Sequence, residues 1–117
     1  MARVVTVRKE DGTVVCERCV LADSWWLRLR GLLGRADLPA DEGILLRPAG
    51  SIHMFFMRFA IDAVFLDRRQ RVVRVRAGLR PWRVVPLVLR AHSVLELPAG
   101  TVADLTLERG EQLSIEP

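Results

Sequence analysis

This chain is a series of short apolar segments separated by turn signals. Runs rich in Val, Ile and Leu recur, and most are followed by Gly, Pro or an Asp-Gly pair that lets the chain reverse. Such runs are typical of β-strands, because branched side chains pack well on a pleated surface. The pattern predicts a mainly β protein (a β-rich α+β fold), built as a small, mostly antiparallel barrel or sandwich. The expected strands lie at residues 3–8, 13–21, 44–47, 52–57, 63–66, 71–77, 93–97 and 112–115.

One segment has helical spacing instead. Between residues 24 and 33, apolar side chains such as Trp25 and Leu32 recur on one face of a helix. Ser24 can cap the first turn by accepting a backbone N–H bond. Gly34 suits the position after the last turn, where a left-handed backbone is common. We therefore expect one clear helix at about residues 24–33.

Two further segments are less regular. Residues 101–107 fit either a short second helix or a strand. Residues 84–89 are apolar but contain Pro86, which cannot donate a ladder hydrogen bond, so we expect an edge or irregular segment there.

The length and hydropathy of the chain predict one globular domain. The chain has 117 residues, of which 50% are hydrophobic and 27% charged, enough for one hydrophobic core. No apolar run approaches the roughly 20 residues that a membrane span needs, and the first residues lack the apolar stretch of a signal peptide. We expect a single soluble domain over residues 1–117, cytoplasmic and without a membrane partner.

The net charge of +4 is a weak signal for nucleic acid. Nearly all the positive charge is arginine, which is more simply a codon effect of a GC-rich genome than selection for phosphate binding. A solvated face is the first interpretation of five arginines over one expected hairpin, and a weak phosphate-binding surface is the alternative. No ribonucleoprotein motif or recognition helix accompanies them, so nucleic acid is not the expected partner. This arginine strip comprises Arg68, Arg69, Arg71, Arg74 and Arg76.

Residues 51–67 hold the most apolar part of the chain together with polar side chains, among them His53 and Asp62. A polar group inside an apolar run must find a partner, or the fold loses roughly 1–3 kcal/mol on mutational scales. These residues are therefore either bonded structural groups or the lining of a site. A turn at residues 58–62 would place His53 opposite Asp67 across a hairpin and favour the charged imidazole.

Each candidate side chain has a structural and a functional interpretation. His53 is either hydrogen-bonded within the core or a group that binds a ligand or transfers protons near neutral pH. Asp62 either accepts backbone N–H bonds at a turn, which we favour, or faces a ligand. Trp82 is more often a core or lid aromatic than a stacking platform.

The sequence does not decide the partners of two charged residues outside this stretch. Arg35 follows the helix-ending glycine, so it can reach back to helix carbonyls, pair with Asp37 or Glu96, or bind an anion. Glu96 lies between two leucines, so strand alternation predicts that it is exposed or paired with an arginine.

Cys16 and Cys19 form a C-x-x-C pair, a spacing used by zinc and redox sites. A structural zinc site needs four ligands, and the remaining soft ligands, His53 and His92, lie at no recognised spacing. Within a strand the two cysteines should point to opposite faces. We therefore expect reduced thiols that pack as small apolar groups, with no metal and no cofactor.

Several ordered motifs occur together: Arg30-Gly31-Leu32-Leu33-Gly34-Arg35, Gly43-Ile44-Leu45-Leu46, Ser51-Ile52-His53, Phe56-Met57, Ile61-Asp62, Val64-Phe65-Leu66-Asp67, Pro81-Trp82-Arg83 and Val94-Leu95-Glu96-Leu97-Pro98-Ala99-Gly100. With them the chain resembles the bacterial and archaeal family known as domain of unknown function one hundred and ninety-two, over about residues 28–115. The resemblance implies a compact β-rich fold and no established biochemical activity. It also implies that some relatives are exported and others are not.

The leading hypothesis is a non-enzymatic domain that binds a small molecule or a protein. The expected cleft lies near the 51–67 stretch, and its candidate residues are Arg35, His53, Met57, Asp62 and Trp82. The first alternative is a hydrolytic or proton-transfer enzyme that uses His53 with Asp62 or Asp67. The second is weak nucleic-acid binding through the arginine strip. The sequence assigns no catalytic residue.

Overall fold

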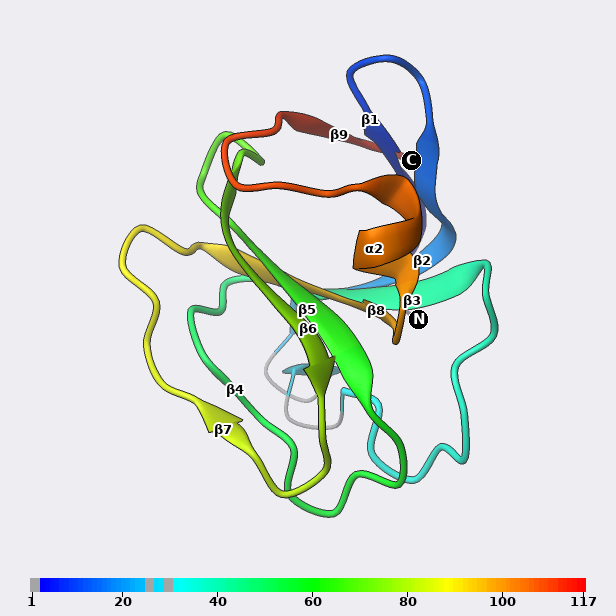
Figure 1. The fold of residues 1–117 in the computed structure, drawn as a ribbon, viewed down its shortest axis with the longest axis vertical. Coiled ribbons are helices and arrows are strands. Elements are labelled where there is room, and N and C mark those ends of the chain that lie inside the picture. The colour runs from blue at the N-terminus through cyan, green and yellow to red at the C-terminus, as the bar shows by residue number, and fades with distance from the viewer. Residues whose placement is uncertain (1–2, 25–26, 29–30) are drawn as a thin grey trace.

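The computed structural model of the chain describes residues 3–24, 27–28 and 31–117. Figure 1 shows the described elements as a curled sheet with a short ribbon of two strands beside it. Along the chain these are β1 (Arg3–Lys9), β2 (Val14–Ala22), β3 (Glu42–Leu46), β4 (Ile52–His53), β5 (Ile61–Leu66), β6 (Val72–Leu79), β7 (Val84–Val85), β8 (Ser93–Pro98), α2 (Thr101–Leu105) and β9 (Leu113–Glu116).

Seven of these strands form one sheet in the order β6-β5-β8-β3-β2-β1-β9, and β4 pairs with β7 in a second, two-stranded sheet. The pairings in the large sheet are antiparallel except that β2 and β3 run parallel. The large sheet curls until its two edges approach, where an isolated bridge joins Arg71 to Gln112. The prediction of a small, mostly antiparallel, β-rich fold is confirmed as a half-barrel.

Both faces of the large sheet are covered. The concave face holds a core that includes Val7, Leu45 and Leu95, and Val102 of α2 packs against it. The other face packs against the β4–β7 ribbon and the segment that contains Leu32, forming a second core. Strands in the middle of the sheet therefore bury side chains of both parities, and every residue of β5 is buried.

The expected helix at residues 24–33 is shorter in the structure. Leu27 and Arg28 are helical, and the Leu27 amide donates to the Ser24 side-chain oxygen at 3.2 Å, as expected of a cap. Residues 31–34 form turns, and both Gly31 (φ 48°) and Gly34 (φ 84°) adopt the left-handed backbone. The rest of the expected helix, including Trp25, lies outside the described residues.

The ambiguous segment at residues 101–107 is helical as far as Leu105. Residues 84–89 form the two-residue strand β7 followed by irregular chain, as the sequence predicted. The strand expected at residues 52–57 is wrong beyond its first two residues. After β4 the chain turns at Phe55 and Phe56, and both of these side chains are exposed.

The hairpin expected between residues 52–57 and 63–66 is also wrong. His53 of β4 pairs with Val84 of β7. Strand β5 instead pairs with β6 and β8. The error followed from treating an apolar run as one continuous strand, although its side chains divide between a ribbon, an exposed turn and the central sheet.

Cys16 and Cys19 point to the same face, so the prediction of opposite faces is wrong. A bulge in β2 lets two residues, Glu17 and Arg18, oppose one residue of β1, since Val5 pairs with Cys19 and Val7 with Cys16. The extra residue shifts the alternation by one position. Both cysteines are free thiols buried in the concave core.

Candidate functional site

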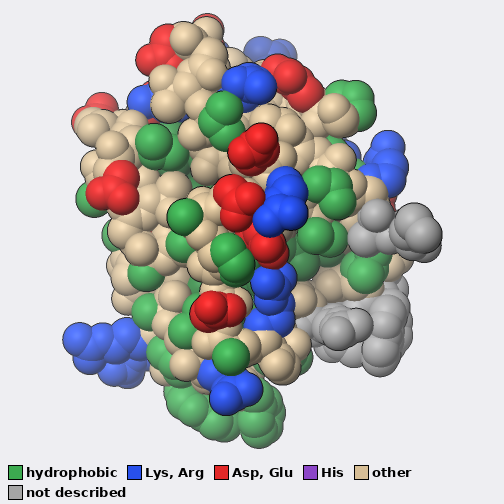
Figure 2. All heavy atoms as spheres, turned by 90° about the vertical axis from the view of Figure 1, so that its right-hand side faces the viewer, with side chains coloured by type: hydrophobic (Ala, Val, Ile, Leu, Met, Phe, Trp, Pro, Cys, Tyr) green, Lys and Arg blue, Asp and Glu red, His purple; other side chains and the backbone are tan. Residues whose placement is uncertain are grey.

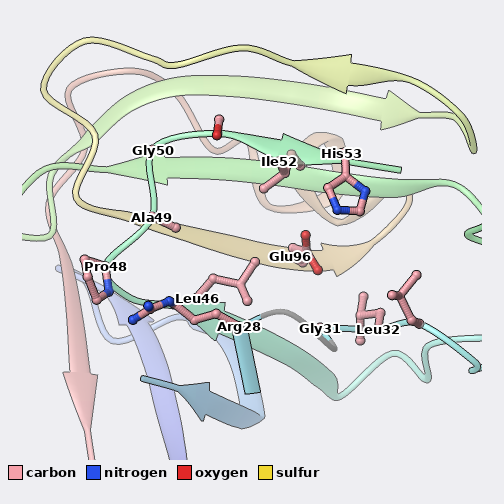
Figure 3. A pocket seen from close by; sticks show the side chains of 12 residues that line it. Arg28, Gly31, Leu32, Leu46, Pro48, Ala49, Gly50, Ile52, His53 and Glu96 are labelled. Atoms are coloured by element: carbon pink, nitrogen blue, oxygen red, sulfur yellow. The ribbon is translucent and has the colours of Figure 1, made fainter. Parts of the chain in front are cut away.

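A cavity of about 250 Å³ opens between the centre of the large sheet and the β4 segment (Figure 3). One wall comes from β3 and β8, and the others come from Arg28, residues 31–33 and residues 48–53. Most of the lining is apolar, and the polar side chains that face it come from three separate parts of the chain. The lining residues are Arg28, Gly31, Leu32, Leu33, Leu46, Pro48, Ala49, Gly50, Ser51, Ile52, His53 and Glu96.

Glu96 is the most buried of these polar groups, with 6% of its surface exposed. It lies on β8 in the middle of the sheet, between Ala63 of β5 and Ile44 of β3. No hydrogen bond or ion pair joins its carboxylate to any of the described residues. Burial removes water from the carboxylate and raises the pKa of Glu96 from 4.5 to about 7.

The prediction that Glu96 is exposed is wrong, and none of the described arginines pairs with it. Alternation does put Glu96 on the face opposite Leu95 and Leu97, but the second core covers that face. Figure 3 shows the carboxylate pointing into the cavity. The side chain is thus shielded by the fold and yet open to a molecule that enters the cavity.

His53 contributes an imidazole to the same cavity from β4. Its Nδ1 accepts the backbone N–H of Phe55 at 3.3 Å, and its ring stacks on the Phe55 ring with centroids 5.1 Å apart. In the neutral ring this bond leaves the proton on Nε2. The backbone and Phe55 therefore set the orientation of an imidazole that can donate one hydrogen bond.

Arg28 and Ser51 complete the polar lining. Arg28 stands on the helical turn after Ser24, where its amide donates to the Ser24 carbonyl at 3.0 Å. In Figure 3, Arg28 and His53 lie on either side of Glu96. The cavity thus offers a cation, an imidazole and a carboxyl whose pKa burial raises to about 7.

Of the residues predicted to line a site, His53 lines this cavity and Arg35 lines an adjoining one. The second cavity, about 190 Å³, shares Leu32 and Leu33 with the first. Arg35 pairs with Glu42 at 3.0 Å, a partner that the sequence did not suggest. Met57 is buried in the second core, with 8% of its surface exposed.

Asp62 has a structural role. It is fully buried, and its carboxylate accepts three backbone N–H bonds, from Gly78 at 2.8 Å, Gly100 at 3.1 Å and Val102 at 2.9 Å. These bonds tie β5 to the bulged end of β6 and to the first turn of α2. This arrangement fits the favoured sequence interpretation, in which Asp62 accepts backbone N–H bonds.

The carboxylates proposed as partners of His53 are bound elsewhere. Asp67 accepts the backbone N–H groups of Arg69 at 2.8 Å and Arg71 at 3.0 Å, at the turn between β5 and β6. The expected His53–Asp67 pair does not form, because β4 and β5 are not hairpin partners. Glu96 is the carboxyl that shares a cavity with His53.

Trp82 is exposed rather than part of a core, with 59% of its surface accessible. It packs against Phe55 and Phe56, with ring centroids 6.0 Å and 4.9 Å away. It does not line the cavity, but Phe55 joins it to His53.

Glu96 is the site residue that the sequence missed. A usable signal was present, because residues on both sides of Glu96 are apolar at both parities. That pattern indicates a strand buried on both faces. Applied to residues 93–97, it would have predicted a buried carboxyl.

The cysteine pair is separate from this cavity. Hydrogen bonding to Cys16 and burial both raise the pKa of the Cys19 thiol. No group of three or more His, Cys, Asp or Glu side chains that could hold a metal ion occurs within the described ranges.

Comparisons with known proteins give a family without an activity. The model of the DUF192 family, described as "Uncharacterized ACR", matches residues 5–115. The chain belongs to this family. A UPF0127 protein of Thermococcus sibiricus is 33% identical over 114 residues, which cover 94% of this chain and 73% of that protein. A UPF0127 protein of Pyrococcus horikoshii is 38% identical over 96 residues, covering 80% of this chain and 83% of that protein.

The fold has also been seen in a crystal structure. A protein of unknown function from Novosphingobium aromaticivorans matches with a TM-score of 0.81 and 25% identity, covering 97% of this chain and 84% of that one. The likeness supports the half-barrel and assigns no activity. In the part of the chain that the structure describes, no helix is long and apolar enough to cross a membrane.

Proposed function

We propose that this DUF192 chain binds a small organic molecule in the cavity lined by Arg28, His53 and Glu96. The observation that carries the proposal is the carboxyl of Glu96, which is buried in the sheet centre and faces an apolar cavity. Burying a carboxyl costs free energy, so such a group is more often found at a functional site than in a plain core. A bound molecule with a donor or cationic head would offset that cost.

The size of the cavity restricts the molecule. A cavity of about 150 Å³ holds benzene, and typical ligand pockets begin near about 300 Å³. At about 250 Å³ this cavity has room for a fragment-sized molecule and not for a nucleotide. The apolar walls formed by Leu32, Leu46 and Ile52 favour a hydrocarbon or ring body, with one polar head at Glu96.

Binding is favoured over hydrolysis by the orientation of His53. Ser51, His53 and Glu96 all line the cavity, which is the residue set of a serine hydrolase. In such enzymes Nδ1 donates to the acid and Nε2 accepts the nucleophile's proton. Here Nδ1 accepts the backbone N–H of Phe55. In the neutral ring the proton therefore stays on Nε2, which cannot take a proton from a nucleophile.

The test uses three probes that share a benzyl or phenyl body and differ in the head: benzylamine, benzyl alcohol and benzoate. Binding is followed by amide NMR shifts of the uniformly labelled protein. We expect shifts confined to residues around Leu46, Ile52 and Glu96. Benzylamine should bind more tightly as the pH rises through 7, because ionised Glu96 attracts the ammonium, and benzoate should show the opposite trend.

A matched pair of variants separates the cavity from the surface. Ala49→Phe fills the cavity, since Ala49 lines it, whereas Ala77→Phe adds the same ring on an exposed position of β6. The first variant should abolish the shifts and the second should keep them. Shifts that survive Ala49→Phe, or no shift with any probe at millimolar concentration, would contradict the proposal.

A further inference from the structure

Three exposed aromatic side chains gather on one part of the molecule. Phe55, Phe56 and Trp82, here called the aromatic tip, are 40%, 72% and 59% exposed. Figure 1 places the loops that carry them at the lower end of the fold, and Figure 2 shows an apolar cluster there. Val84, the first residue of β7, is exposed as well. The exposed Leu87 and Leu89 follow β7 and border a separate hollow with residues 73–75 and 107–109.

The aromatic tip is held rigidly on its two loops. Met54 is 1% exposed beneath it, and its backbone bonds to both loops. The Met54 amide donates to the Arg83 carbonyl at 2.7 Å, and the Trp82 amide donates to the Met54 carbonyl at 2.7 Å. The rings therefore do not need to be ordered when a partner binds, which lowers the entropy cost of association.

The backbone of the aromatic tip is strained in a way that stability does not require. Phe56 has φ 64° and Trp82 has φ 70°. A left-handed backbone costs a bulky L-residue about 1–2 kcal/mol. Glycine would adopt these angles freely. The fold thus carries a cost in order to present two large rings to solvent, and such outliers occur mostly at functional positions.

The loops of the aromatic tip are positively charged. Residues 54–59 and 80–83 contain three arginines and no acidic residue. Arg58, Arg80 and Arg83 are exposed on the two loops that hold the rings. A partner at the aromatic tip must therefore be anionic and must accept apolar side chains.

We propose that the aromatic tip docks this chain on an anionic lipid bilayer. Aromatic side chains settle at the level of the headgroups, and arginines pair with lipid phosphates. The tip is a projection and not a groove, which suits a flat and deformable partner. This differs from the expectation of no membrane partner, which rested only on the lack of a spanning segment.

Single-stranded nucleic acid is anionic too, but the rings suit it less well. Bases stack on open aromatic faces. Here the Phe56 and Trp82 rings meet at 59° with centroids 4.9 Å apart, so each ring covers part of its neighbour. The exposed Val84 offers no stacking surface and fits hydrocarbon instead.

The experiment measures flotation of the full chain with vesicles of phosphatidylcholine alone and of phosphatidylcholine with one quarter phosphatidylglycerol, at low salt. We expect binding to the anionic vesicles only. Phe56→Gly and Trp82→Gly should each weaken it by about tenfold, because a buried aromatic side chain is lost. Arg80→Gln should weaken it by about fivefold, the loss expected for one basic residue near a charged surface.

Matched controls keep the result interpretable. Val4→Thr changes an exposed apolar residue on β1, and Arg109→Gln removes an exposed arginine outside the two loops of the aromatic tip. Both variants should bind as the wild type does. The glycine variants should keep their melting temperature, because glycine relieves the strained angles. Equal binding to both vesicle types, no binding to either, unchanged binding of the glycine variants, or binding to a single-stranded oligonucleotide in place of vesicles would each overturn the proposal.

Discussion

Replacing Glu96 by glutamine should stabilise the protein at alkaline pH and leave its stability nearly unchanged at acid pH. Burial raises the pKa of Glu96 from 4.5 to about 7 in the folded chain. Below 4.5 the carboxyl is protonated in both states. Between 4.5 and 7 the unfolded chain releases the proton while the native state keeps it, so the free energy of unfolding falls as the pH rises. Above 7 both states are ionised and the loss is complete.

The size of the effect follows from the difference between the two pKa values. About 2.5 pKa units at about 1.36 kcal/mol per unit give about 3 kcal/mol. In a domain of this length, that free energy corresponds to roughly 10 °C in melting temperature. Glutamine keeps the shape of the protonated glutamate and cannot ionise, so the variant should gain this amount at pH 8 and almost none at pH 4.5.

Urea denaturation followed by tryptophan fluorescence measures both values. The wild type and the variant share every other titrating group, so the difference between them isolates Glu96. The denaturant slopes should agree, since the same surface is exposed on unfolding. A stability difference that is equal at the two pH values would refute the assignment of a raised pKa to Glu96. It would also remove the main argument for the cavity as a binding site.

Two other substitutions test the packing around the site. Gly43→Ala should destabilise the protein by about 1–3 kcal/mol, because a Cβ there would meet the Glu96 carbonyl oxygen at 2.8 Å and the Cys16 Sγ at 2.9 Å; an unchanged urea midpoint would mean that the sheet can move aside. Asp62→Ala leaves three backbone donors without an acceptor and should cost about 3 kcal/mol or more. Amide exchange at Gly78 should then be faster, and wild-type exchange in a stable variant would contradict the structural role of Asp62.

Strand positions were predictable where apolar and polar residues alternate, or where odd and even positions are both apolar. This was the case for β1, β5, β6 and β8. The position of β4 was not, because Phe55 and Phe56 look like the interior of a buried strand. No turn-forming residue marks the reversal, and Phe56 reaches it through a left-handed backbone that sequence pattern disfavours. The bulge at Cys16 was equally invisible, since neither glycine nor proline accompanies it.

The candidate site was predicted in part. His53 was found because a polar residue in an apolar run needs an explanation, and it does line a cavity. The carboxyls chosen as its partners were nearest in the sequence, whereas the structure supplies Glu96 from a strand more than forty residues away. Which strand lies beside β4 depends on long-range pairing, and no local pattern in one sequence contains that information.

The stability cost of Glu96 bears directly on how tightly the cavity can hold a molecule. Ionising this carboxyl in the empty cavity costs about 3 kcal/mol, and a leucine at the same position would carry no such cost. A bound head group that pairs with the ionised form brings its pKa back toward 4.5, and by linkage the recovered free energy appears as affinity. Full recovery of about 2.5 pKa units corresponds to a factor of about 300 in binding constant. A molecule with the same apolar body and no such head would gain none of it, so the fold can discriminate between ligands by one functional group.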